Sequence, residues 1–149
     1  MLLSHQRMLN VWLIAAGHEG ENLEEALRMH SLGHNLKVLA NDAEFNELAE
    51  GLGGEFTRYP HLLMYLIRDN AHEADGWLEG LKAMEGLRQV PVIVFYADPV
   101  KPNARRLYAL GAASVIRVPM RFEGLVEIMR IIEAYWFNIV LTPEIASKN

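Results

Sequence analysis

The chain has 149 residues, of which 51% are hydrophobic and 22% charged, with a net charge of −5 and no cysteine. These values are typical of one globular domain that buries a core without disulfides, and they exclude thiolate chemistry. The acidic balance argues against a nucleic-acid-binding surface, and no apolar run approaches the roughly 20 residues that span a bilayer.

The amino-terminal stretch MLLSHQRMLN is too short and polar for a secretory signal. We therefore expect a cytoplasmic protein without a membrane segment. Its residues 1–149 are expected to form a single domain, with a core over about residues 10–137 and a tail over 138–149.

The first two thirds of the chain alternate short apolar runs with amphipathic segments. Runs of strand length, bounded by turn residues, occupy residues 11–15, 36–40 and 62–67. Helices that start at Asn22, at Asn41 or Asp42, and at Asp75 are expected over residues 22–32, 41–52 and 75–88, with Asn22 as the cap of the first. Glycines at 33 and 53 follow the first two helices and are typical C-terminal stops.

The pattern is clearest between residues 90 and 119. The buried run 92–95 precedes Asp98-Pro99 and Lys101-Pro102, which break the chain because a residue before proline avoids helical geometry. Asn103 then caps a helix to Leu110, a second apolar strand covers 114–117, and a final helix is expected over 121–137. Strand, helix and strand in about thirty residues indicate a right-handed crossover in a parallel sheet.

Five strand–helix repeats predict an α/β fold: a flavodoxin-like, doubly wound parallel sheet in three layers, with strand order 2-1-3-4-5. Ligands of such sheets bind beyond the carboxyl ends of the strands. No Gly-x-Ser-x-Gly elbow, Walker loop or paired histidine spacing is present, so the sequence predicts no enzyme, no cofactor and no metal.

The stretches VPVIVFYA, LGAASVIRVP and FEGLVEIM resemble the second half of a response-regulator receiver domain. In that family, two acidic residues after the first strand hold magnesium and an aspartate ending the third strand accepts a phosphoryl group. A threonine or serine ends the fourth strand, and a lysine before a cis-proline ends the fifth. Carried onto this sequence, these positions are Ala16, Gly17, Leu66 or Arg68, Tyr96 and Val118.

The phosphoacceptor position depends on the count, because counting from Pro60 gives Leu66 and counting back from Asp75-Gly76 gives Arg68. Neither is an aspartate. None of these positions supplies the carboxylate, small hydroxyl or ammonium that magnesium binding and phosphoryl transfer need. The resemblance therefore implies a pseudo-receiver of bacterial two-component signalling that does not take part in a phosphorelay.

Two alternatives stay open at this site. Asp69 would be a displaced phosphoacceptor if Glu19 or Glu21 helped to hold magnesium. Alternatively, the vacated pocket binds a small ligand against Tyr96 and Leu66. A simpler expectation is that the Tyr96 ring fills the pocket.

The final helix ends in Tyr135-Trp136-Phe137, and an apolar trio follows it. Three consecutive aromatic residues cannot all face one side of a helix, so at least one should point outward as part of an interface. This ending resembles the stand-alone receivers that partner phytochromes and dimerise through helix four, strand five and helix five.

The resemblance implies a homodimer and a histidine kinase or photoreceptor as partner. The expected interface residues are Arg117, Tyr135, Trp136, Phe137, Ile139 and Leu141. The alternative is that the aromatic residues fold back on their own domain. The arginines at 105, 106, 117, 121 and 130 would form a rim of ion pairs or a solvated face.

Overall fold

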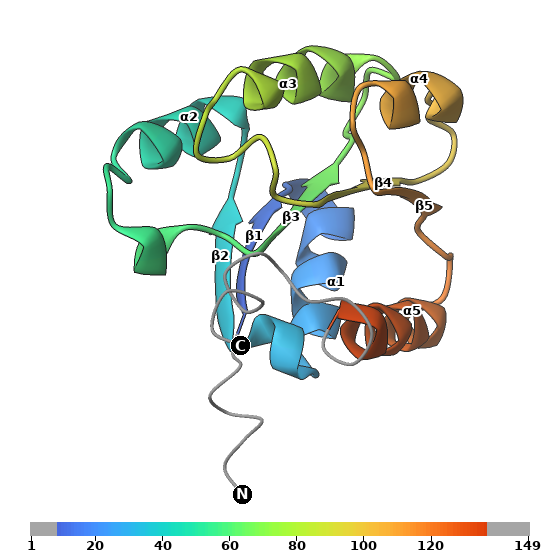
Figure 1. Cartoon of the computed structure of the whole chain (residues 1–149). Helices are drawn as coiled ribbons and strands as arrows, with labels where there is room; N and C mark the ends of the chain where they lie inside the picture. The colour runs from blue at the N-terminus through green and yellow to red at the C-terminus, as the bar shows by residue number, and fades with distance from the viewer. Residues whose placement is uncertain (1–8, 137–149) are drawn as a thin grey trace, which may run out of the picture.

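The computed structural model describes residues 9–136. Five parallel strands form one sheet in the order β2-β1-β3-β4-β5, which confirms the predicted topology (Figure 1). The strands are β1 (Asn10–Ile14), β2 (Asn35–Leu39), β3 (Leu62–Leu66), β4 (Val92–Tyr96) and β5 (Ser114–Arg117). Every strand pair is parallel, so all carboxyl ends lie at one edge of the sheet.

Helices cover both faces of this sheet and give the three predicted layers (Figure 1). On one face lie α1 (Gly17–Arg28) and α5 (Phe122–Ala134). On the other face lie α2 (Asp42–Glu50), α3 (Glu73–Lys82) and α4 (Ala104–Ala109). Within the described residues, each helix is too short or too polar to cross a membrane.

The inner strands β1, β3 and β4 are apolar on both sides because each face needs its own core. The core under α1 and α5 contains Leu13, Met64 and Phe95. The core under α2, α3 and α4 contains the residues next to these along the strands. They include Trp12 and Val94, which belong to the same core as Phe45. Phe45 is fully buried and meets Trp12 and Trp77 edge-on, with ring centroids 5.9 and 5.3 Å apart.

Helix α1 begins earlier than predicted, at Gly17 instead of Asn22. Ala16 is extended, and Gly17 adopts a φ of +79°, a conformation that glycine reaches without steric cost. Gly20 packs against Ala15 so closely that a Cβ at this position would lie 3.2 Å from it. Residues 17–20, which precede the predicted start, therefore form the first turn of the helix.

Two of the predicted helix starts are confirmed. The side chains of Asn41 and Asn103 accept hydrogen bonds from the backbone N–H groups of Glu44 and Arg106, three residues further on. Helix α3 begins earlier than predicted, at Glu73 instead of Asp75, but it is shorter because it ends at Lys82 instead of residue 88.

Phe45→Ala should lower the free energy of unfolding by about 3–5 kcal/mol, since it removes a fully buried ring and leaves a cavity. Phe56→Ala is the matched control, because Phe56 is 74% exposed and should change stability by no more than about 1 kcal/mol. Urea unfolding followed by circular dichroism measures both. Equal losses for the two variants would contradict the packing of α2 on β1.

Candidate functional site

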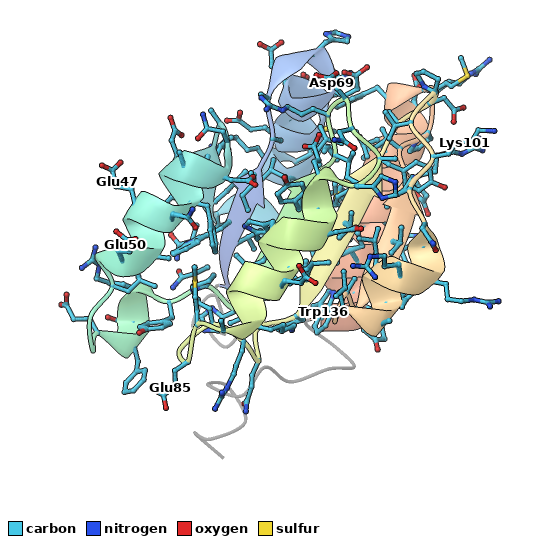
Figure 2. The ribbon with its side chains drawn as sticks, turned by 90° about the horizontal axis from the view of Figure 1, so that it is seen from above. Glu47, Glu50, Asp69, Glu85, Lys101 and Trp136 are labelled. Atoms are coloured by element: carbon cyan, nitrogen blue, oxygen red, sulfur yellow. The ribbon has the colours of Figure 1, made fainter. Side chains whose placement is uncertain are left out.

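A hollow of about 420 Å³ lies at the carboxyl ends of β1, β3 and β4, where doubly wound sheets bind ligands. It is lined by Ala16, Gly17, Glu19, Leu66, Ile67, Arg68, Asp69, Ala97, Asp98, Pro99 and Val100. The sequence therefore placed Ala16, Gly17, Leu66, Arg68 and Asp69 at the right edge of the sheet. Figure 2 shows Asp69 at this edge, with Trp136 at the far end of the molecule.

Leu66 is the last residue of β3 and is only 3% exposed. Its side chain belongs to the core under α1 and α5, so it presents no reactive group to the hollow. Arg68 and Asp69 follow on the exposed loop to α3. Of the two counts for the phosphoacceptor position, the one from Pro60 gives Leu66, and this is the residue at which β3 ends.

Tyr96 does not fill the hollow, and the expectation that it does is wrong. Tyr96 ends β4 and packs, half-buried, against the core on the α2, α3 and α4 face, whereas Leu66 belongs to the opposite core. Its ring lines a neighbouring hollow of about 530 Å³, together with Lys101 and Arg117. A ligand held between Tyr96 and Leu66 therefore does not fit this geometry.

Val118 lies just beyond β5 and donates its backbone N–H to the Tyr96 carbonyl at 2.7 Å. Its half-buried side chain packs against the core under α1 and α5. In the described residues, the cis peptide bond is Asp98–Pro99, on the β4–α4 loop, and not the bond after Val118. The position that the resemblance assigns to a lysine is therefore a packing position.

The side chains present do not fit the magnesium site that the resemblance implies. Ala16 and Gly17 offer no side-chain oxygen, and Mg²⁺ prefers carboxylate ligands. Glu19, Asp69 and Asp98 line the hollow. However, within residues 9–136 no three acidic or histidine side chains lie close enough together to hold a metal.

Sequence reasoning missed a polar network beside the hollow. Tyr65, on β3, is 2% exposed, and its hydroxyl donates to Asp42 Oδ1 at 2.9 Å and lies 3.4 Å from Glu73 Oε2. Burial, with the charges of Asp42 and Glu73, raises the pKa of the Tyr65 hydroxyl above its ordinary value. The sequence could have indicated this network, because a tyrosine in a buried strand needs a partner for its hydroxyl.

Glu73 also holds the β3–α3 loop. Its Oε1 accepts hydrogen bonds from the backbone N–H groups of both Asp69 and Asn70, each at 3.2 Å. Two consecutive loop amides directed at one carboxylate form a small anion-binding turn, and here the anion comes from the same chain. The conformation of this loop therefore needs no external anion.

On the β5 and α5 side, some of the residues expected at an interface are exposed, one is buried, and others lie outside the described residues. Arg117 is 63% exposed and pairs with Asp98 at 3.5 Å, and Tyr135 is 46% exposed. Trp136 is only 9% exposed and packs in the core under α1 and α5, as the fold-back alternative has it. Phe137, Ile139 and Leu141 lie outside the described residues.

Three of the arginines expected at the interface rim already have partners within the chain. Arg106 pairs with Asp75 on α3 at 3.0 Å, Arg117 pairs with Asp98, and Arg130 pairs with Glu127 on α5. Arg105 and Arg121 make no ion pair with any described residue. Exposed pairs of this kind contribute little stability.

No protein-family model matches the sequence. Among solved structures, the phosphorylated cyanobacterial phytochrome response regulator RcpA superposes with a TM-score of 0.74 at 18% identity, covering 91% of this chain and 98% of RcpA. This chain has the receiver fold. The Mn²⁺-bound response regulator Rcp1 is similar to this receiver fold with a TM-score of 0.72 at 17% identity, covering 91% of this chain and 99% of Rcp1.

Two curated proteins match part of the sequence. A probable methanogenesis regulatory protein, FilR2 of Methanothrix harundinacea, is 30% identical over 100 residues, which are 67% of this chain and 63% of FilR2. A probable transaldolase of Thermoplasma volcanium is 28% identical over 100 residues, which are 64% of this chain and 45% of that protein. The chain thus matches between about half and two thirds of the length of these relatives.

Glu73→Ala should raise the hydrogen-exchange rates of the Asp69 and Asn70 amides by about tenfold, because both lose a charged acceptor. Glu79→Ala is the control, since Glu79 lies on the same helix but pairs with Arg106 at 3.8 Å. NMR-detected exchange at these two amides is the measurement. Unchanged rates in the Glu73 variant would show that its carboxylate does not hold the loop.

Proposed function

We propose that this chain is a receiver-type signalling protein that works by protein–protein interaction and self-association, without phosphorylation at the end of β3. One observation carries this proposal: the chain has the receiver scaffold, but the reactive position at the end of β3 is the buried Leu66. A buried leucine has no atom that can form an acyl phosphate, so the third strand cannot supply a phosphoacceptor at its end.

The neighbouring positions support the same proposal. Ala16 and Gly17 carry no oxygen for a cation, and Val118 carries no ammonium for a phosphoryl group. Glu73 occupies the amides of the β3–α3 loop with its own carboxylate. The loop thus has an anion in place whether or not a donor of phosphoryl groups is present.

The names of the similar proteins agree with a signalling role. RcpA is a phytochrome response regulator and FilR2 is a probable regulatory protein. We infer from these likenesses that the partner is a histidine kinase or a photoreceptor, and that the chain acts in the cytoplasm.

Exposed apolar residues favour an interface on the α4, β5 and α5 side. Tyr108 on α4, Met120 before α5, and Ile131 and Tyr135 on or after α5 are between 46% and 97% exposed. Exposed apolar residues with arginines on the same elements are typical of a protein–protein interface. We propose that a second copy of the chain covers this side.

Phosphorylation is tested by treating the chain with acetyl phosphate and Mg²⁺ and measuring the intact mass. We expect no mass gain, because the aspartate at the end of β3 is replaced by Leu66. Asp69→Ala and Asp98→Ala accompany the wild type as a matched pair, since both carboxylates are exposed at the same hollow. A phosphoryl adduct that disappears only in Asp69→Ala would overturn the proposal and identify Asp69 as the acceptor.

Self-association is tested by sedimentation velocity of the wild type and Tyr135→Glu. We expect the wild type to be a dimer and the variant to dissociate at least about tenfold more readily, because a carboxylate would be buried at the apolar contact. Met29→Glu is the control, since Met29 is 59% exposed at the end of α1. A monomeric wild type, or a Tyr135→Glu variant that stays fully dimeric, would exclude this interface.

A further inference from the structure

A third hollow lies at the opposite edge of the sheet, at the amino ends of β1 and β2. It has a volume of about 360 Å³ and lies between β2, the end of α2 and the turn at Phe56–Arg58. Its apolar lining includes Trp12, Leu48 and Leu52, of which Trp12 and Leu52 are 1% and 2% exposed. Its polar rim contains His34, Lys37 and Arg58.

Lys37 stands where the fold would normally place an apolar side chain. It is the register partner of Trp12, and it shares a face of β2 with Leu39, which packs in the core under α2. Instead of being covered, Lys37 is exposed and its side chain borders the hollow. Lys37 and Trp12, on neighbouring strands, therefore line the same hollow.

The charged residues that line this hollow, Lys37 and Arg58, are both basic, and the nearby Glu55 carboxylate pairs with Arg58. The chain has 19 acidic and 14 basic residues, yet no carboxylate of the described residues lines the hollow. Figure 2 shows Glu47 and Glu50 on the outer side of α2. The hollow therefore differs from the rest of an acidic protein, and it favours a negatively charged occupant.

Hydrogen-bond donors at the rim are available to such an occupant. Arg58 Nη1 donates to the Gly51 carbonyl at 3.2 Å and to Glu55 Oε1 at 3.0 Å, which holds the guanidinium in place while its other N–H groups remain unused by the described residues. Lys37 and His34 make no side-chain hydrogen bond or ion pair with any described residue. The rim thus presents donors with unfilled capacity, of which the Arg58 guanidinium is held in place.

We propose that this hollow binds a small organic anion with an apolar body. The anionic group would lie between Lys37 and Arg58, and the aromatic or aliphatic body would lie over Trp12, Leu48 and Leu52. The volume lies within the range of about 300–1,000 Å³ that is typical of small-molecule pockets. This site is independent of the hollow at the carboxyl ends and of the proposed signalling function.

Two probes with the same rings separate charge from hydrophobicity. The ¹⁵N-labelled full chain is titrated with 8-anilinonaphthalene-1-sulfonate and, separately, with the uncharged N-phenyl-1-naphthylamine. We expect saturable one-to-one binding of the sulfonate, with amide shifts centred on Leu36, Lys37, Leu48 and Arg58. The uncharged amine should bind at least about tenfold more weakly, because it lacks the charged contact.

Lys37→Glu should weaken sulfonate binding by at least about tenfold, since it reverses the charge at the rim. Lys101→Glu is the control, because Lys101 lies on the β4–α4 loop at the other side of the sheet (Figure 2). Circular dichroism checks that both variants remain folded, and both changes are at exposed positions. Shifts centred elsewhere, equal binding of the two probes, or equal effects of the two substitutions would each overturn the proposal.

Discussion

The burial of β3 on both faces is the constraint on which this structure depends. All five residues of this central strand are buried, and its side chains alternate between the two cores. Such a strand leaves no polar atom unmatched in its interior, and the one hydroxyl that it carries, on Tyr65, is bonded to Asp42. Chemistry is thereby confined to the loops beyond the ends of the strands.

The carboxyl and amino edges of the sheet differ because the adjoining loops and helices cover each edge to a different extent. At the carboxyl ends, short connections run directly into α1 and α3, so helix starts and loop amides gather there, together with Glu73. At the amino ends, α2 stops short of the start of β2, and the described residues leave a hollow beside Lys37. One edge is thus occupied by the chain itself, whereas the other presents unused donors.

Much of the fold could be predicted from the sequence because the strands are nearly continuous apolar runs. Asn41 and Asn103 identified two helix starts correctly, since a capping side chain acts within its own turn. The start of α1 was predicted wrongly, because the positive φ of Gly17 turns the chain straight from strand to helix and needs no polar cap.

The candidate site was predicted less completely. Ala16 and Leu66 were placed correctly, because the carboxyl ends of parallel strands meet at one edge. The side on which Tyr96 lies was missed, although strand alternation sets it opposite to Phe95, which belongs to the α1 and α5 core. The contact between Glu73 and the loop depends on a side-chain rotamer, which residue spacing does not reveal.

The carboxylate that Glu73 contributes to the β3–α3 loop differs from an acyl phosphate in its lifetime. An acyl phosphate is added by one reaction and removed by hydrolysis, so its lifetime acts as a timer. A glutamate that belongs to the chain's own covalent structure has no such lifetime. The charge at this loop is therefore a permanent part of the folded chain.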